Sequence, residues 1–141
     1  MAYWLLKSEP DAFSWDDLKK RGAKGEPWTG IRNHTAKLNL MKMKKGERGF
    51  FYHSNGKEIV GICEIVRPAY PDPTAKAGEP WVAVDIKAVA PMPKPVTLAA
   101  IKTAPKLGAM ALLKQSRLSV PPVTDAEWKL VCKMGGLAGA P

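Results

Sequence analysis

Aromatic side chains are the first feature of this sequence that could do chemistry, because a planar ring can hold another planar group against its face. Trp4, Trp28 and Tyr52 are the aromatic candidates. An unstacked nucleobase presents two π faces and one hydrogen-bonding edge, so a pocket for it needs aromatic planes and fixed donors and acceptors. Trp28 is the best candidate for a pocket wall, because segment 25–30 reads as a loop, where a core tryptophan is less expected. A place in the core is the alternative for all three.

Polar side chains that could bond to the edge of a base lie near these aromatic residues in the sequence. Serine and asparagine can both donate and accept hydrogen bonds, whereas lysine only donates. The candidates are Lys7, Ser8, Asn33, His53, Ser54 and Ser119. Because side chains alternate along a strand, Tyr52 and Ser54 should face one way and His53 the other. Ser54 could instead serve only as a turn former.

Positive charge is concentrated in one segment. Five cations fall within twelve residues and face one acid, Glu47: Lys37, Lys42, Lys44, Lys45 and Arg48. The chain carries 22 lysines and arginines against 13 acids, a net charge of +9. Such a field attracts polyanions, so we expect this segment to contact a nucleic-acid backbone. A solvated helix face is the alternative. Arg32 and Arg117 are candidates for phosphate contacts or for structural networks.

Catalytic and metal-binding motifs are missing from the sequence. Cys63 and Cys132 form no CxxC pair, and His34 and His53 stand apart from any cluster of ligating residues. There is no glycine-rich phosphate loop and no GxSxG motif. We therefore expect no metal, no cofactor and no catalysis. An enzyme acting on nucleic acid, with Glu9 and His53 as an acid–base pair, and a module for a free nucleoside-like molecule are the alternatives.

The elements that position these residues interleave strands with short helices, which is typical of an α+β domain. With 141 residues, 45% of them hydrophobic, the chain suffices for one core. Strands are expected at 3–6, 48–53, 59–66, 81–89 and 117–120; helices at 15–21, 31–43 and 125–134; helical turns at 98–102 and 109–113; and an extended linker at 91–95.

The ends of the chain and its apolar runs complete these expectations. Residues 135–141, rich in glycine and alanine, should form a flexible C-terminal tail after a domain that spans 1–134. No apolar run approaches the ~20 residues of a membrane span, so no membrane partner is expected. The N-terminus has no secretory pattern, which indicates the cytoplasm.

Five stretches, taken in order, resemble the EVE domain family, a branch of the PUA-like fold related to the YTH and ASCH domains. They read YWLLKSEP at 3–10, WTGIRN at 28–33, FYHSN at 51–55, AYPDPT at 69–74 and QSRLSV at 115–120. The resemblance implies a PUA-like mixed β-barrel flanked by short helices. It also implies a ligand pocket built from these separated motifs, to which Gly30, Arg32, Arg117 and Leu118 would contribute.

EVE domains are implicated in binding modified bases in nucleic acid, including modified cytosine in DNA. The resemblance therefore implies a non-catalytic domain that reads a modified or flipped-out base in DNA or RNA. The chain departs from the family pattern after Asn33, where a second arginine is common and this sequence reads His-Thr-Ala-Lys. Lys37 keeps the charge there but not the planar fork of a guanidinium.

Overall fold

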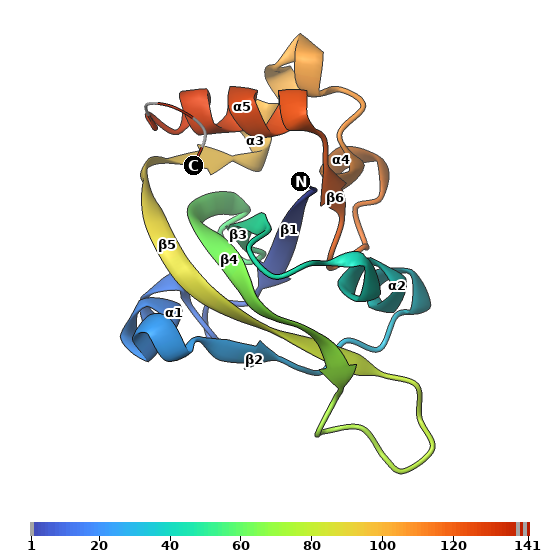
Figure 1. Ribbon diagram of the computed structural model, residues 1–141. Helices are drawn as coiled ribbons and strands as arrows, with labels where there is room; N and C mark the ends of the chain where they lie inside the picture. The colour runs from blue at the N-terminus through green and yellow to red at the C-terminus, as the bar shows by residue number, and fades with distance from the viewer. Residues whose placement is uncertain (1, 138, 140) are drawn as a thin grey trace.

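A computed structural model describes residues 2–137, 139 and 141, and its central feature is one curved mixed sheet (Figure 1). In this part of the chain the strand order is β2-β5-β4-β3-β1-β6. The strands are β1 Tyr3–Ser8, β2 Glu26–Trp28, β3 Arg48–His53, β4 Glu58–Pro71, β5 Val82–Thr97 and β6 Pro122–Val123. β1 and β3 run parallel, and the other neighbours are antiparallel. The sheet is not closed, so the predicted mixed barrel is confirmed in an open form.

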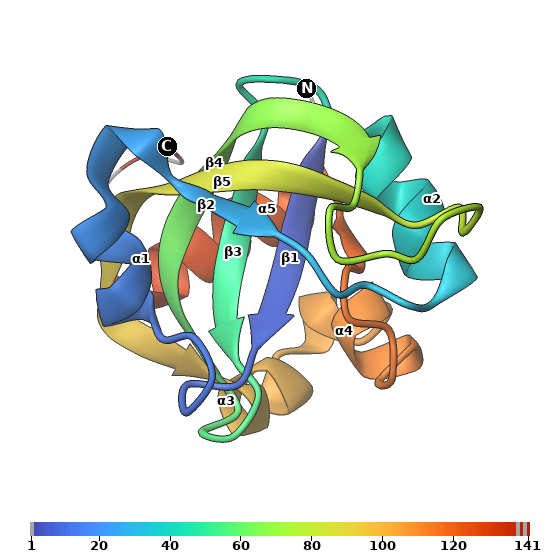
Figure 2. The same cartoon turned by 90° about the horizontal axis from the view of Figure 1, so that it is seen from below.

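Short helices flank both faces of the sheet (Figure 2). They are α1 Trp15–Arg21, α2 His34–Lys42, α3 Leu98–Thr103, α4 Ala111–Lys114 and α5 Asp125–Met134. Ser14 and Asp17 form a capping box at the start of α1, and Thr124 and Glu127 form one at the start of α5. These boxes satisfy backbone N–H groups that have no partner inside the helix, which is why both helices begin where the sequence predicts.

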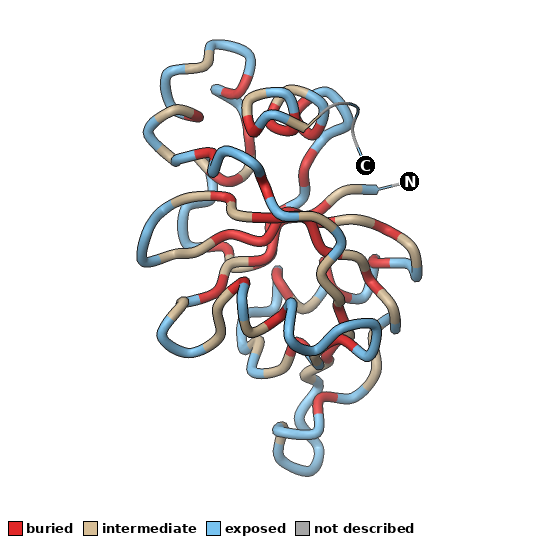
Figure 3. The backbone as a smooth tube through the Cα atoms, turned by 90° about the vertical axis from the view of Figure 1, so that its left-hand side faces the viewer, coloured by how far each residue is buried: buried red, intermediate tan, exposed pale blue. Residues whose placement is uncertain are grey.

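The sheet separates two hydrophobic cores, one on each face. The buried residues gather along the strands in the middle of the molecule (Figure 3). The first core packs α1 and α2 against residues that include Trp4, Trp28 and Phe51. The second packs α3, α4 and α5 against Phe50, Tyr52 and other residues. Trp128 of α5 stacks between two rings, with centroid distances of 4.3 Å to Tyr3 and 4.0 Å to Phe50. Alternation along β1 and β3 thus sends neighbouring side chains into different cores.

Three expected elements differ from the observed ones because the sheet overrides local sequence. Part of the expected loop at 25–30 is β2, which pairs with β5. The expected linker at 91–95 belongs to the second half of β5, because the φ angle of proline is compatible with an extended strand. The register between β4 and β5 shifts in this region, between Ile59 and Gly61. The strand expected at 117–120 occurs instead at Pro122–Val123, on a sheet edge where proline is tolerated.

Other boundaries move by shorter distances. The helix expected at 31–43 begins at His34, because Asn33 caps it. Gly135 and Leu137, in the expected tail, have backbone N–H groups that donate to Val131 and Cys132 of α5. The tail residues 138 and 140 lie outside the described residues. Across the described residues, every helix falls short of the length and hydrophobicity that crossing a membrane requires.

Gly61 of β4 lies under the indole of Trp15, and this contact fixes α1 on the sheet. A Cβ at this position would lie 2.5 Å from the Trp15 ring. We predict that Gly61→Ala lowers the free energy of unfolding by about 1–3 kcal/mol, because the indole must move out of a packed core. Gly56→Ala is the control, since its Cβ would meet nothing closer than 3.8 Å. Urea unfolding measures both; equal losses would contradict the assignment.

Candidate nucleic-acid interface

A hollow of about 270 Å³ lies where β1 ends beside β2 and the turn at residues 9–13. Its apolar wall comes from Phe13, Trp28 and Ile31, and its polar lining includes Lys7, Ser8, Glu9 and Thr29. The Phe13 and Trp28 rings meet edge to face, with centroids 6.1 Å apart. We call this the Phe13–Trp28 hollow. Its volume is slightly below the ~300 Å³ at which pockets for drug-sized ligands begin, so it suits one small planar group.

The turn at residues 9–13 is fixed by hydrogen bonds that start from the end of β1. The Glu9 carbonyl accepts from the backbone N–H groups of Ala12 and Phe13. The Ser8 hydroxyl, itself buried, donates to the Phe13 carbonyl. Ser8 therefore lines the hollow, but its hydroxyl already has an acceptor. Its role is to hold Phe13 in place.

Trp28 is mostly a core residue that leaves a small part of its surface in the hollow. Only 9% of its surface is exposed, and its ring packs edge-on against Phe51 with centroids 5.7 Å apart. The loop position expected for Trp28 is wrong, because β2 places it in the sheet. The tryptophan forms the floor of the hollow, and the half-buried Phe13 adds a second ring.

Trp4 and Tyr52, the other two aromatic candidates, lie elsewhere. The Trp4 indole is buried in the first core and donates to the Glu47 carboxylate at 3.1 Å. Tyr52 faces the second core, on the opposite side of the sheet. It lines a separate hollow of about 280 Å³, which we call the Lys7–Lys57 hollow, together with Ser54, Leu98, Leu112 and Ser116. Trp4, Trp28 and Tyr52 therefore do not share a cavity.

Lys7 connects these two hollows because it lines both. Its ammonium donates to the Ser116 carbonyl at 2.8 Å, and burial lowers the pKa of this lysine. The Ser54 N–H donates to the Ser8 carbonyl at 2.9 Å, which ties the ends of β1 and β3 together. A further hollow of about 460 Å³ adjoins them and is lined by Glu9, Asp11, Ser54 and Asn55.

Asp72 holds the segment that borders the Phe13–Trp28 hollow. Its buried carboxylate accepts from the Gly30 N–H at 2.8 Å and from the Arg32 guanidinium at 3.1 Å. It also accepts from the Thr74 hydroxyl and N–H at 2.7 Å each. Burial alone would raise the pKa of Asp72, but the hydrogen bonds outweigh it and lower the pKa to about 2. Gly30 is required because its φ is +82°.

Arg32 and Asn33, both predicted base or phosphate contacts, have structural partners. The Arg32 guanidinium bonds to Asp72 and Thr74 and lies 5.8 Å from the centre of the Trp81 ring. The Asn33 side chain accepts from the Ala36 N–H at 2.9 Å as the cap of α2. Both residues therefore shape the border of the hollow, and the 39% exposure of the Arg32 side chain leaves it accessible to a ligand.

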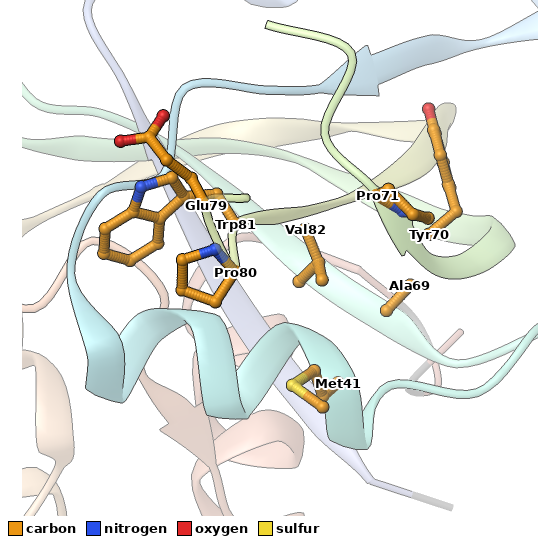
Figure 4. A pocket seen from close by; sticks show the side chains of 8 residues that line it. All are labelled: Met41, Ala69, Tyr70, Pro71, Glu79, Pro80, Trp81 and Val82. Carbon is orange, nitrogen blue, oxygen red and sulfur yellow. The ribbon is translucent and has the colours of Figure 1, made fainter. Parts of the chain in front are cut away.

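A groove of about 430 Å³ runs beside α2 on the other side of this segment (Figure 4). Trp81, Val82 and Tyr70 line it together with Met41, which is 55% exposed. The His34 ring lies 4.9 Å from the Trp81 ring. Met41 of α2 thus forms one wall of a mostly apolar groove.

The remaining predicted contacts do not line the hollows described above. His53 faces α1, opposite to Tyr52 as predicted, and its Nε2 accepts from the Trp15 N–H at 3.0 Å. Burial lowers the pKa of His53 against the opposing effects of Glu58 and Asp16, so the neutral acceptor form is favoured. Leu118 is buried in the first core. The Ser119 carbonyl accepts from the Lys7 N–H at 3.1 Å, and Arg117 lies exposed in the preceding turn.

The basic segment presents most of its charge to solvent. Lys42, Lys44 and Lys45 are exposed, and Lys37 is half-buried. The nearby acid, Glu47, is turned inward: it accepts from the Ala2 and Lys44 N–H groups and from Trp4. Burial is the largest single effect and would raise the pKa of Glu47, but the hydrogen bonds together outweigh it and lower the pKa.

Arg48 differs from these lysines. Its guanidinium pairs with Glu64 at 3.0 Å within the sheet. The lysines are therefore the cations of this segment that are available to a polyanion.

Several residues that line or support the hollows are not among the predicted contacts. Glu9 belongs to the KSEP stretch and Asp72 to the AYPDPT stretch, so both were within the motifs that carry the family resemblance. Phe13 and Ile31 lie in or beside such stretches, but nothing in their local sequence marks them as lining residues. Within the described residues, His, Cys, Asp and Glu side chains form no group of three or more that could hold a metal ion.

Comparison with known proteins agrees with this architecture. The family model described as "EVE domain" matches residues 2–134. Human thymocyte nuclear protein 1 is 36% identical over 165 aligned positions, which cover 94% of this chain and 73% of that protein. A crystal structure of a protein from Agrobacterium tumefaciens is 51% identical, with a TM-score of 0.98 and coverage of 100% of this chain and 97% of that one.

Two further solved structures contain nucleic acid. The human THYN1 protein, in complex with 5-methylcytosine-containing DNA, is 34% identical with a TM-score of 0.89, and the match covers 99% of this chain and 100% of that one. The YTH domain of Zygosaccharomyces rouxii MRB1, in complex with N6-methyladenosine RNA, shares the fold alone at 11% identity and a TM-score of 0.59.

Fold and site together define a PUA-like domain with an open mixed sheet and a small aromatic hollow at the end of β1. The chain belongs to the EVE domain family.

The low pKa of Asp72 leads to a pH-dependent stability. A carboxyl whose pKa falls from 3.8 to about 2 on folding stabilises the fold fully above pH 3.8 and loses that contribution as the pH falls toward 2. We predict that Asp72→Asn lowers the free energy of unfolding at pH 7. The difference in the free energy of unfolding between this variant and the unmodified protein should shrink by about 2 kcal/mol as the pH falls from 5 to 2.

Urea unfolding at a series of pH values measures this gap. Asp11→Asn, which removes an exposed carboxylate, is the matched control and should leave stability nearly unchanged. A gap for Asp72→Asn that is the same at every pH would show that the carboxylate charge is not what holds the two segments together.

Proposed function

We propose that this protein is a non-catalytic reader of a modified base in DNA, with 5-methylcytosine as its ligand, and that the base lies in the Phe13–Trp28 hollow. The observation that carries the proposal is a base-sized hollow with two aromatic rings on a chain of net charge +9. The human relative that was solved with 5-methylcytosine-containing DNA covers nearly the whole chain and supports the same ligand class.

The lining of the hollow matches the chemistry of a methylated cytosine. Phe13, Trp28 and Ile31 offer apolar surface to the ring faces and to the 5-methyl group. Glu9 and Glu26 are the acidic residues of the lining, and Glu26 is already paired with Arg21 at 3.0 Å. Glu9 is therefore the carboxylate that would accept a hydrogen bond from the exocyclic N4 amino group of cytosine. Thymine carries the same methyl group but has an acceptor at that position, so Glu9 would disfavour it.

The DNA backbone would extend from the hollow to the exposed lysines of the basic segment, which lie near the start of β1 beside Glu47. Lys42, Lys44 and Lys45 follow the segment 28–33 through α2, and their nearest acid in sequence, Glu47, is buried. Lysine neutralises phosphate as a point charge and carries no sequence information. This division of roles gives affinity to the basic segment and selectivity to the hollow.

Catalysis by Glu9 and His53 is disfavoured by the hydrogen bonding of His53. A general base needs a free lone pair within reach of the substrate. The Nε2 lone pair of His53 already accepts from the Trp15 N–H, and this contact fixes the start of α1. His53 is therefore held in place by the fold and is not available as a general base.

Substitution of Glu9 tests the assignment of the base edge. We predict that Glu9→Ala weakens binding of a duplex with one 5-methylcytosine by about fivefold to tenfold, because the N4 amino group loses its acceptor. Asp11→Ala is the matched control: it removes the same charge from the adjoining hollow, away from the Phe13–Trp28 hollow. Its affinity should stay within about twofold of the unmodified protein, on the order of 0.4 kcal/mol.

Fluorescence anisotropy with methylated and unmethylated duplexes measures both variants. A loss for Glu9→Ala no larger than that for Asp11→Ala would show that Glu9 does not bond to the edge of the base. An unmodified protein that bound both duplexes equally, or bound free nucleoside but no duplex, would remove the proposed function and favour the small-molecule alternative.

A further inference from the structure

The ammonium of Lys7 is a half-buried cation without a carboxylate partner among the described residues. It donates to the Ser116 carbonyl at 2.8 Å, and the salt bridges of this part of the chain do not include it. A buried charge is costly unless a charge of opposite sign accompanies it. The low pKa of Lys7, caused by burial, agrees with this deficit. An anion in the adjacent hollow would supply the missing charge.

A second cation borders the same hollow from the β3–β4 turn. Lys57 lines it together with Lys7, Tyr52, Ser54 and Ser116. Lys57 has a φ of +54°, and it is the one non-glycine residue in the described chain with a positive φ. Its carbonyl accepts from the Leu98 N–H at 2.8 Å, which holds this conformation. Backbone strain of this kind clusters at ligand-binding and switch regions.

The chemistry of this lining fits a phosphate group. Two lysines supply positive charge, and three lining residues, Tyr52, Ser54 and Ser116, carry hydroxyl groups. The Ser54 hydroxyl already donates to the Ser8 carbonyl at 3.3 Å. Charged hydrogen bonds from ammonium to phosphate are among the stronger ones in proteins. An apolar ligand would leave both features unused, and a phosphate offers more acceptor oxygens to them than a carboxylate does. The volume of about 280 Å³ admits a phosphate with part of its sugar.

The two hollows lie on either side of the end of β1. Lys7 lines both, and the Ser8 carbonyl receives the Ser54 N–H across the gap between β1 and β3. The adjoining hollow with Glu9 and Asp11 is acidic and would repel phosphate. A nucleotide with its base in the Phe13–Trp28 hollow therefore has one favourable direction for its phosphate, which leads past Lys7.

We propose that the Lys7–Lys57 hollow binds a phosphate group. This phosphate belongs to the nucleotide whose base lies in the Phe13–Trp28 hollow, an assignment that rests on the proposed function. The shared chemistry is a phosphate with one or two negative charges. A DNA backbone and a free nucleotide could both supply it.

Inorganic phosphate and deoxycytidine monophosphate test the hollow without DNA. In a titration followed by amide NMR shifts, both should move Ser54 and Lys57 in the unmodified protein. Lys57→Ala should weaken this binding by about tenfold, which corresponds to about 1.4 kcal/mol. Lys57→Arg should retain it. Lys129→Ala, which removes the same charge from the exposed face of α5, is the control and should change nothing. Absence of shifts at Ser54 and Lys57, or equal binding to Lys57→Ala, would overturn the proposal.

DNA with a single neutral methylphosphonate linkage beside the 5-methylcytosine identifies the source of the phosphate. The unmodified protein should lose about tenfold in affinity when one linkage is neutral, and Lys57→Ala should lose little more. Equal sensitivity of both proteins to that linkage would overturn the DNA assignment. Phosphate binding that depends on Lys57, without any DNA binding, would support the phosphate site and refute the proposed function. Failure of the phosphate site and failure of the proposed function therefore give different results.

Discussion

The buried carboxylate of Asp72 is the interaction on which the site depends. It joins the segment of Gly30 and Arg32 to the turn at Thr74, although these segments are distant in sequence. A charge without exposed surface persists only because each of its lone pairs finds a donor. Through Gly30 and Arg32, Asp72 fixes the border of the Phe13–Trp28 hollow and the place of Trp81 in the neighbouring groove. Movement of either segment would change the shape of both the Phe13–Trp28 hollow and the groove that contains Trp81.

The end of β1 divides the recognition surface into parts with different chemistry. Ser8 holds Phe13 on one side, and Lys7 reaches the Ser116 carbonyl on the other. An aromatic hollow and a cationic hollow therefore meet at neighbouring residues of one strand. Because side chains alternate along a strand, this arrangement needs no long insertion or mobile loop. A base and its phosphate differ in chemistry in the same way, and one rigid strand end could bind both.

Local sequence predicts those elements whose signals are local. The capping boxes at Ser14 and Thr124 place α1 and α5, and β3 has its expected bounds. The aromatic site was harder to predict, because core and pocket tryptophans look alike until distant strands pair. Trp28 entered the sheet through β5, and Tyr52 faced the second core because α3, α4 and α5 cover that side. Phe13 and Asp72 acquire their roles only through contacts with residues that are distant in the sequence.

The position of the methyl group in the complex tests the central claim most directly. A DNA duplex with a ¹³C-labelled methyl group on one cytosine, bound to the protein, can be examined by nuclear Overhauser effects. The account predicts contacts from the methyl protons to the rings of Phe13 and Trp28, with an upfield shift caused by those rings. Methyl contacts only to the neighbouring bases of a stacked duplex would show that the base does not enter the hollow, and would contradict the account.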